Sequence, residues 1–129
     1  MPDTGKAALG GIDGNLAALL GYIIWIIALI SVIMEKENRF VKFHSVQVLF
    51  LAALQIAIGL VLGFLGLILN LALNTFDMGW MSWFMILGLR FILAIVFLIL
   101  WIMGGIKAYG GQWYKLPIIG EFAWKAVNK

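Results

Sequence analysis

The side chains that could do acid–base or ligand chemistry are few, and most lie between the first two long apolar runs. The segment from Glu35 to Gln47 reads Glu-Lys-Glu-Asn-Arg-Phe-Val-Lys-Phe-His-Ser-Val-Gln and contains His44, the only histidine. His44 could relay a proton. A metal site needs further ligands, and the chain has no second histidine and no cysteine. We therefore expect His44 to hydrogen-bond the local backbone and to have no catalytic role.

No arrangement of residues typical of an enzyme is visible. Ser31, Ser45 and Ser82 lack an accompanying His–Asp pair. Glu35 and Glu37 lie in a charge-alternating stretch and do not form a facing pair of acids, and no phosphate-binding glycine loop or metal-ligand spacing is present. An enzyme acting on lipid, the one catalytic alternative, would lack both an acid–base pair and a metal site. We predict a protein that is not an enzyme and uses no cofactor and no metal.

Composition places the chain in a membrane. Of its 129 residues, 64% are hydrophobic and 12% are charged, whereas charged residues make up about a quarter of a typical soluble domain. The apolar residues form runs of about 18 or more, the length that crosses a bilayer core. The net charge of +3 is not gathered into a basic patch, so nucleic-acid binding is not predicted.

Three apolar runs predict an all-α integral membrane protein with three transmembrane helices. The runs are Leu16 to Met34, Val46 to Leu73 and about Met81 to Ile106. The second run is longer than a span needs, so the helix either tilts or begins along the interface. A division of this run into two segments, which would give four in all, stays open.

The polar ends predict a simple domain organisation. Residues 1–15 form a polar N-terminal tail, residues 16–107 the transmembrane helical domain and residues 108–129 a cytoplasmic tail. In that tail Glu121 and Lys125 can pair on one face of a helix, which predicts a short amphipathic helix on the membrane surface. A frayed tail is the alternative. The apolar face of the helix would consist of Ile118, Ile119, Phe122 and Ala126.

The positive charges predict an orientation in the cell (inner) membrane. With three spans, the first loop and the C-terminal tail share one side, and the opposite side carries only Lys6. Because short cytoplasmic loops are rich in Lys and Arg, we predict a multi-pass protein with its N-terminus outside and its C-terminus in the cytoplasm. The basic residues on the predicted cytoplasmic side are Lys36, Arg39, Lys42, Lys107, Lys115, Lys125 and Lys129.

Small and amide residues form a stripe along one face of the second apolar run. Gly59-x-x-x-Gly63 is a motif that lets helix backbones approach closely. We predict that this face packs against another helix, of the same chain or of a second copy, with a polar seam along a water-filled path as the alternative. At about 100° per residue, the stripe comprises Gln55, Gly59, Gly63, Gly66 and Asn70, with His44 on the same arc.

Arg90 is the one charged residue inside a predicted span. An arginine at that depth costs at least about 2.5–3.5 kcal/mol unless it pairs or reaches the interface. We predict a structural anchor whose guanidinium reaches toward the interface marked by Trp80 and Trp83. Contact with an ion or a substrate is the alternative. The predicted partners are Asp77, Asn70 and Asn74.

The segment from Glu35 to Gln47 also resembles the signature of a widespread family of small prokaryotic membrane proteins of unknown function. This family is grouped with the Tic-twenty-like proteins, named after a chloroplast inner-envelope protein-import component. A second stretch resembles the ending of that family: Lys107-Ala108-Tyr109-Gly110-Gly111 and then Lys115-Leu116-Pro117-Ile118-Ile119-Gly120-Glu121. The resemblance implies an all-helical protein of three or four spans and supplies no catalytic residue. It also implies one structured membrane-surface element, which we predict to be an interaction site, formed by Glu35, Asn38, Arg39, Phe43, His44 and Gln47.

These observations predict a non-enzymatic module for helix packing and assembly. Its partners would be the lipid bilayer and either a second copy or another membrane protein, so that it is an oligomer or part of a membrane complex. The alternative is a subunit of a channel or transporter for a polypeptide, as the protein-transport resemblance implies, or for a small solute or ion. The path would then be lined by Gln55, Asn70, Arg90 and His44.

Overall fold

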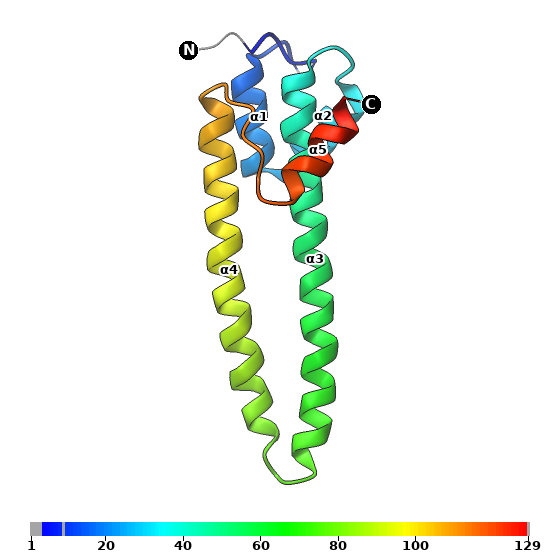
Figure 1. The fold of residues 1–129 in the computed structure, drawn as a ribbon, viewed down its shortest axis with the longest axis vertical. Helices are drawn as coiled ribbons and strands as arrows, with labels where there is room; N and C mark the ends of the chain where they lie inside the picture. The colour runs from blue at the N-terminus through cyan, green and yellow to red at the C-terminus, as the bar shows by residue number, and fades with distance from the viewer. Residues whose placement is uncertain (1–3, 9, 129) are drawn as a thin grey trace. The chain divides into compact units, whose positions relative to one another are not determined.

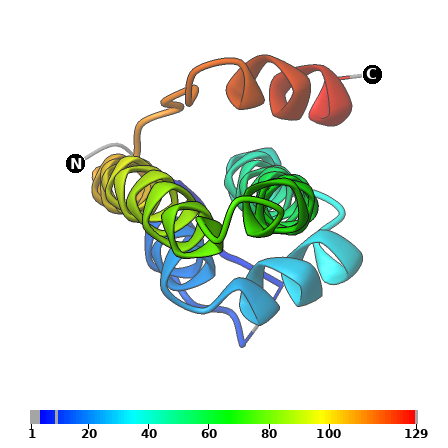
Figure 2. The same cartoon turned by 90° about the horizontal axis from the view of Figure 1, so that it is seen from below.

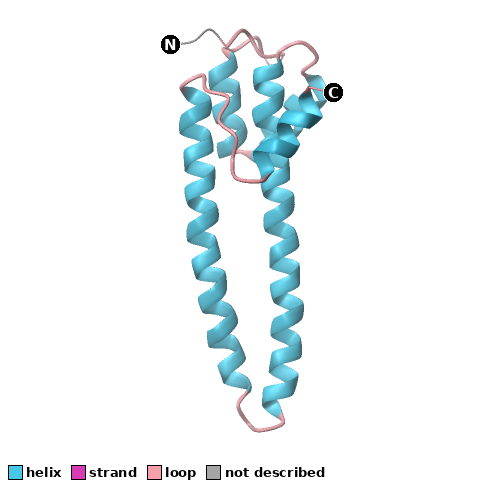
Figure 3. Cartoon of the chain, viewed as in Figure 1, coloured by secondary structure: helices cyan, strands magenta, loops and turns pink. Residues whose placement is uncertain are grey.

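The computed structural model describes residues 4–8 and 10–128. Nearly all of the regular secondary structure in these residues is helical (Figure 3). The chain falls into two compact units (Figure 1): unit 1 comprises the residues up to Ala52 together with those from Ile99 onward, and unit 2 comprises Ala53–Leu98. The helices in chain order are α1 (Gly14–Ile23), α2 (Trp25–Met34), α3 (Arg39–Asn74), α4 (Gly79–Tyr109) and α5 (Ile119–Val127).

Helices α3 and α4 are the two that are long and apolar enough to cross a membrane. They contain 36 and 31 residues, with mean hydropathies of 2.6 and 2.7 over their most apolar stretches. At about 1.5 Å per residue they measure about 54 and about 46 Å, which exceeds the roughly 30 Å of the hydrocarbon core. The prediction that the second and third apolar runs form membrane-crossing helices is confirmed, and α3 takes in most of the polar signature segment as its first turns.

The first apolar run is not one continuous helix. It breaks at Ile24, whose backbone is extended (φ −127°, ψ 102°), into α1 and α2 of ten residues each. The two helices fold against each other because small residues meet: a Cβ atom built at Gly21 would lie 3.3 Å from Cβ of Ala28. Each helix is about 15 Å long, half of what a span requires. The predicted count of three transmembrane helices is therefore not confirmed.

The N-terminal segment lies beside the polar loop that follows α2. The amide of Ala8 donates to Oε2 of Glu35 (2.8 Å), and the side-chain amide of Asn38 donates to the carbonyls of Thr4 (2.9 Å) and Lys6 (3.0 Å). The expectation that residues 1–15 and this loop occupy opposite sides of a membrane is therefore not confirmed, since α1 and α2 return the chain to where it started.

Each long helix is capped at the end that lies in unit 1: α3 where it begins, and α4 where it ends. Asn38 precedes α3, and its side-chain oxygen accepts from the amide of Val41 (3.1 Å), as an N-cap does. Helix α4 ends at Tyr109 and is followed by a turn at Gly111, whose φ of 77° is left-handed, with the amide of Gln112 donating to the carbonyl of Lys107 (3.0 Å). Only glycine adopts this conformation without strain. The chain can therefore turn directly after α4 toward the segment before α5.

The predicted C-terminal helix is present as α5, but it buries a different face. Ile119, Gly120 and Ala123 are buried, whereas Phe122 is 59% exposed. Gly120 is in such close contact with Lys115 that a Cβ atom there would overlap it, so the helix packs through its small residues. Figure 2 shows α5 on the opposite side of unit 1 from α1 and α2. Glu121 accordingly pairs with Lys115 (3.0 Å) and not with Lys125.

Gly104 of α4 offers a test of packing in unit 1. In Gly104→Ala the new Cβ would lie 2.7 Å from Cζ and 3.0 Å from Cδ1 of the buried ring of Tyr22. Overpacking of this kind costs about 1–3 kcal/mol, so we expect a lower melting temperature in detergent micelles, followed by circular dichroism. Gly88→Ala in the same helix is the matched control, because its Cβ would meet nothing within 4 Å. Equal melting temperatures for the two variants would contradict this packing.

Candidate functional site

A chain of hydrogen bonds inside unit 1 joins α1, α3 and the segment after α4. The side-chain amide of Gln47 donates to the hydroxyl of Tyr22 (2.6 Å) and to the carbonyl of Tyr114 (3.1 Å). Nδ1 of His44 lies 3.0 Å from the Tyr22 hydroxyl, and Nε2 lies 2.8 Å from the carbonyl of Gln112. A carbonyl only accepts, so Nε2 carries the proton and Nδ1 accepts from the tyrosine. This pattern fixes a neutral imidazole.

The same network fastens the C-terminal segment by its backbone. The oxygen of the Gln47 side chain accepts from the amide of Leu116 (3.0 Å). Gln47 and His44 have no exposed surface, and Tyr22 is 6% exposed. Both donors of the Gln47 amide and both ring nitrogens of His44 have partners within the chain. The network therefore joins segments of unit 1 that lie far apart in the sequence.

Aromatic rings surround this network. The ring of His44 lies edge-on to Phe40 (centroids 4.8 Å apart) and to Phe43 (5.1 Å). Phe43 in turn contacts Trp113 (5.2 Å) and Trp124 of α5 (6.0 Å). These contacts place α5 and the segment before it on the first turns of α3. They also exclude water from the hydrogen bonds, which strengthens each of them.

Glu35 and Asn38 form a second polar cluster, at the loop between α2 and α3. The carboxylate of Glu35 accepts from the amides of Ala8 (2.8 Å) and Asn38 (3.3 Å). Glu35 is 4% exposed although none of the described residues forms an ion pair with it. Backbone amides alone balance its charge, which is the role of a structural carboxylate in a tight loop.

The predicted interaction surface is thus mostly interior. Glu35, Phe43, His44 and Gln47 are buried inside unit 1, and their polar atoms bind the chain itself. Asn38 is half-buried and Arg39 is exposed, with its guanidinium 3.4 Å from the side-chain oxygen of Asn128. Of the six residues, only these two retain surface that another molecule could contact.

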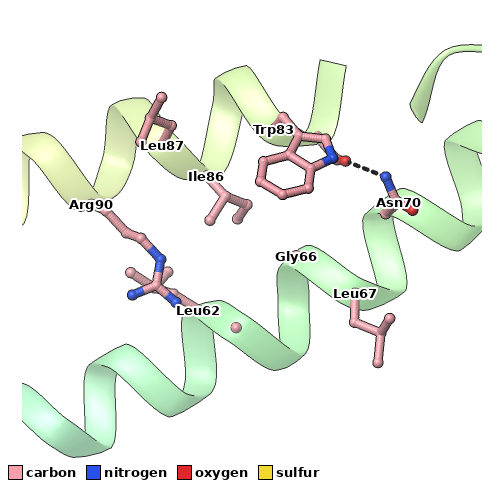
Figure 4. A pocket seen from close by; sticks show the side chains of 10 residues that line it. Leu62, Gly66, Leu67, Asn70, Trp83, Ile86, Leu87 and Arg90 are labelled. Atoms are coloured by element: carbon pink, nitrogen blue, oxygen red, sulfur yellow. Dashed lines mark hydrogen bonds between the residues drawn. The ribbon is translucent and has the colours of Figure 1, made fainter. Parts of the chain in front are cut away.

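The stripe on α3 faces α4 inside unit 2. A Cβ atom built at Gly66 would lie 3.3 Å from Cγ1 of Ile86. Asn70 donates to Oγ of Ser82 (3.1 Å) and to the carbonyl of Gly79 (3.3 Å), as Figure 4 shows for Asn70. The small residues let the two helices approach, and the amide joins them near their turn. The stripe packs within one chain here, and the exposed Gln55 lies one turn before Gly59.

Arg90 lies across the glycines of this stripe (Figure 4). Its Nη2 donates to the carbonyl of Gly59 (2.9 Å), and a Cβ atom at Gly63 would lie 3.5 Å from Nη2. A cavity of about 430 Å³ adjoins the guanidinium, with Arg90, Asn70 and Ser82 as its polar lining and apolar walls that include Leu62 and Trp83. This is the one place in unit 2 where the structure brings predicted site residues together around a space.

The direction of the Arg90 side chain differs from the prediction. Gly66 faces Ile86 and Asn70 bonds Ser82, so residues of α3 with lower numbers lie farther from the turn. By reaching Gly59, the guanidinium points away from the turn and from Trp80 and Trp83. Asn70 and Asn74 bond each other (3.1 Å), and Asp77 forms no ion pair within the described part of the chain. None of the three predicted partners binds Arg90.

Sequence reasoning missed Tyr22, Ser82 and Leu116. A tyrosine hydroxyl inside an apolar run needs a partner, and this signal pointed to a polar contact for Tyr22. Its partner lies 25 residues away in Gln47, a distance that no helical periodicity encodes. Leu116 contributes its backbone amide, which carries no side-chain signature at all.

Gln47→Ala should loosen the segment before α5. The change leaves the Tyr114 carbonyl and the Leu116 amide without their partner, at a cost of about 1–3 kcal/mol for each buried group, while the Tyr22 hydroxyl keeps its bond to His44. We expect the Leu116 amide to exchange its proton at least about tenfold faster by hydrogen–deuterium exchange. Gln112→Ala is the control, since it keeps the backbone carbonyl that His44 uses. Unchanged exchange in Gln47→Ala would show that the amide does not hold this segment.

Comparison with known proteins shows where the chain belongs. Two UPF0132 membrane proteins of Methanocaldococcus jannaschii are similar: one is 36% identical over 121 residues (92% of this chain and 92% of its own length), the other 34% identical over 116 residues (88% and 69%). A UPF0132 membrane protein of Archaeoglobus fulgidus is 31% identical over 117 residues (88% and 95%). No solved structure matches.

The matches support a membrane location and a small prokaryotic membrane-protein family, while the Tic-twenty-like relation stays a prediction. Residues 4–123 match a family model that takes in both units and all or part of every helix. The chain therefore belongs to the family described as the magnetosome magnetite crystal formation protein family.

Proposed function

We propose that this protein is a non-enzymatic integral membrane module that works by assembling with further copies of itself or with another membrane protein. The observation that carries the proposal is the small number of helices in unit 2. It contains only parts of α3 and α4, and the most apolar stretches of these helices are 17% and 6% buried. Two helices cannot enclose a path across the membrane by themselves, and most of the surface of these two remains uncovered, so we infer that further helices pack against them.

The surface of unit 1 supports the same proposal. Its polar core is used internally, so the charged groups left for a partner are those at the edge of the signature segment, such as Lys36, Glu37 and Arg39. A hollow of about 570 Å³ beside them is lined in part by Lys6, Asn38 and Trp113. An open hollow with charges of both signs and an aromatic side chain suits the polar rim of a protein contact. We take from the family its membrane setting and leave contact with a mineral out of the proposal.

For orientation, we propose that both ends of the chain face the cytoplasm. All the Lys and Arg residues except Arg90 lie in the N-terminal segment, between Lys36 and Lys42, or from Lys107 onward, whereas the turn at residues 75–78 carries none. Short loops rich in Lys and Arg remain inside. The turn between α3 and α4 would then lie outside.

A channel or transporter subunit remains the second candidate function. The observation that favours it is the cavity at Arg90, which also has Asn70 and Ser82 in its lining. This candidate needs assembly as well, because the cavity lies on a hairpin of two helices. The relation to protein transport that the Tic-twenty-like resemblance implies belongs to the same candidate.

Assembly can be tested by disulfide cross-linking, because the chain has no cysteine of its own. Single cysteines at Phe84 and Phe91, which are 70% and 66% exposed, face outward from α4. We expect oxidation in native membranes to give a covalent dimer, or an adduct with a partner that carries a cysteine, from at least one outward position. Ser82→Cys is the control, since Ser82 is 3% exposed. A scan of α3 and α4 without adducts, together with a monomeric mass in nanodiscs, would contradict assembly.

Orientation can be tested with a maleimide that does not cross membranes. Cysteines at Ala8, Lys36 and Lys125 should react only in inverted vesicles, and a cysteine at Phe76 only in intact cells, because α3 and α4 each cross the bilayer once. Ala8 separates the two topologies, since three full spans would place it outside. Reaction of the Ala8 cysteine in intact cells would contradict the orientation proposed here.

A further inference from the structure

Arg90 carries a positive charge for which the described residues provide no counter-charge. Between Val46 and Ile106 the only other charged residue is Asp77, and neither forms an ion pair within the described part of the chain. Arg90 lies 11 residues after Gly79, about 16 Å along α4, which is near the middle of a roughly 30 Å core. Charged groups at this depth pair with one another or with backbone carbonyls, and they mark the places where ions or substrates bind.

The direction of the Arg90 side chain excludes the usual way in which a charge inside a membrane is stabilised, which is to reach the nearer interface. An arginine near the end of a span turns its guanidinium to the nearer interface. Gly59 lies seven residues before Gly66, about 10.5 Å along α3, whereas Arg90 lies four residues after Ile86, about 6 Å along α4. By donating to Gly59, the guanidinium therefore lies farther from the turn than its own backbone does, and it does not reach toward the interface at the turn. It is held over a neutral carbonyl that already belongs to a helix.

We propose that the cavity at Arg90 is a binding site for an oxyanion, the phosphate or carboxylate group of a lipid or of a small solute. The guanidinium has five N–H donors in a planar fork, and the described residues accept from it only at the Gly59 carbonyl. The remaining donors match the paired oxygens of a phosphate or carboxylate. The cavity of about 430 Å³ beside them is within the range of small-molecule sites.

The lining supports an anion attached to an apolar group. Apart from Arg90, the polar lining is Asn70 and Ser82, and both donate to partners within the chain. Leu62, Trp83 and Leu87 contribute apolar walls. A charge-bearing end at Arg90 and a hydrocarbon part along these walls would satisfy both kinds of surface. A free anion would use Arg90 alone.

The glycines provide a matched pair of variants. At Gly63 a Cβ atom would be in ordinary contact with Nη2, at 3.5 Å, so Gly63→Ala keeps the site. Gly63→Leu would fill the space beside the guanidinium while Arg90 remains. Arg90→Gln removes the charge and keeps a hydrogen-bonding side chain, and Arg90→Lys keeps the charge without the fork.

The experiment uses the purified full chain in an uncharged maltoside detergent. Four probes are added in turn: inorganic phosphate and acetate as free anions, and dioleoyl phosphatidic acid and oleate as their lipid-borne counterparts. Binding is measured by native mass spectrometry and by the shift of the melting temperature. We expect the wild type and Gly63→Ala to bind at least one probe about tenfold more tightly than Arg90→Gln and Gly63→Leu, with Arg90→Lys in between.

The results distinguish the sources of the anion. If the protein binds only phosphatidic acid or oleate, the anion belongs to a lipid. If it binds only phosphate or acetate, the anion belongs to a small solute. Either result supports the site. Equal binding of every probe by wild type and Arg90→Gln would overturn it, because the basic groups of unit 1 would then account for the binding. If Arg90→Gln does not fold, the Gly63 pair decides: equal binding by Gly63→Ala and Gly63→Leu would overturn the site.

Discussion

The side-chain amide of Gln47 is the interaction on which unit 1 depends. One residue of α3 binds a hydroxyl on α1 and two backbone groups after α4, at 2.6–3.1 Å. Inside an apolar protein each of these groups would cost about 1–3 kcal/mol if left alone, so they hold one another in a single arrangement. Tyr22 then fixes the tautomer of His44, and His44 fixes the carbonyl of Gln112. The position of α5 follows, because the segment that leads into it is bound at Gln112, Tyr114 and Leu116.

The same constraint explains why two helices too short to cross a membrane can exist at its edge. Irregular backbone at membrane depth persists only where the protein itself satisfies it. At the break, the amide of Ile24 still donates to the carbonyl of Leu20 (2.8 Å), and the amide of Ile27 donates to the carbonyl of Ile24 (3.0 Å). The interruption at Ile24 therefore leaves few groups unpaired, and the close contact of Gly21 with Ala28 compensates for the turn.

Hydropathy could predict α3, α4 and the existence of α5, because length and periodicity alone determine these elements. It could not predict the break at Ile24, since Tyr-Ile-Ile-Trp-Ile-Ile is as apolar as any continuous span. The predicted orientation is not confirmed for the same reason: it rested on the first apolar run crossing the membrane as one helix, and the run breaks into two short helices. The glycine stripe pointed to a close helix contact, and its partner could be assigned to α4 only once Arg90 and Ile86 were seen against it.

The signature segment therefore encodes a fold before it encodes an interaction. Glu35, Asn38, His44 and Gln47 resemble a catalytic set by type, yet each binds backbone groups of the same unit, and His44 and Gln47 also bind the Tyr22 hydroxyl. Arg90 differs in this respect, because its donors exceed the acceptors that the described residues offer it. A polar group whose hydrogen bonds are all made within the chain is explained by the fold. A charged group at membrane depth whose donors are not all bonded within the chain calls for a further molecule. By this criterion, the signature segment belongs to the scaffold of unit 1, and Arg90 in unit 2 is the residue at which we propose that a ligand binds.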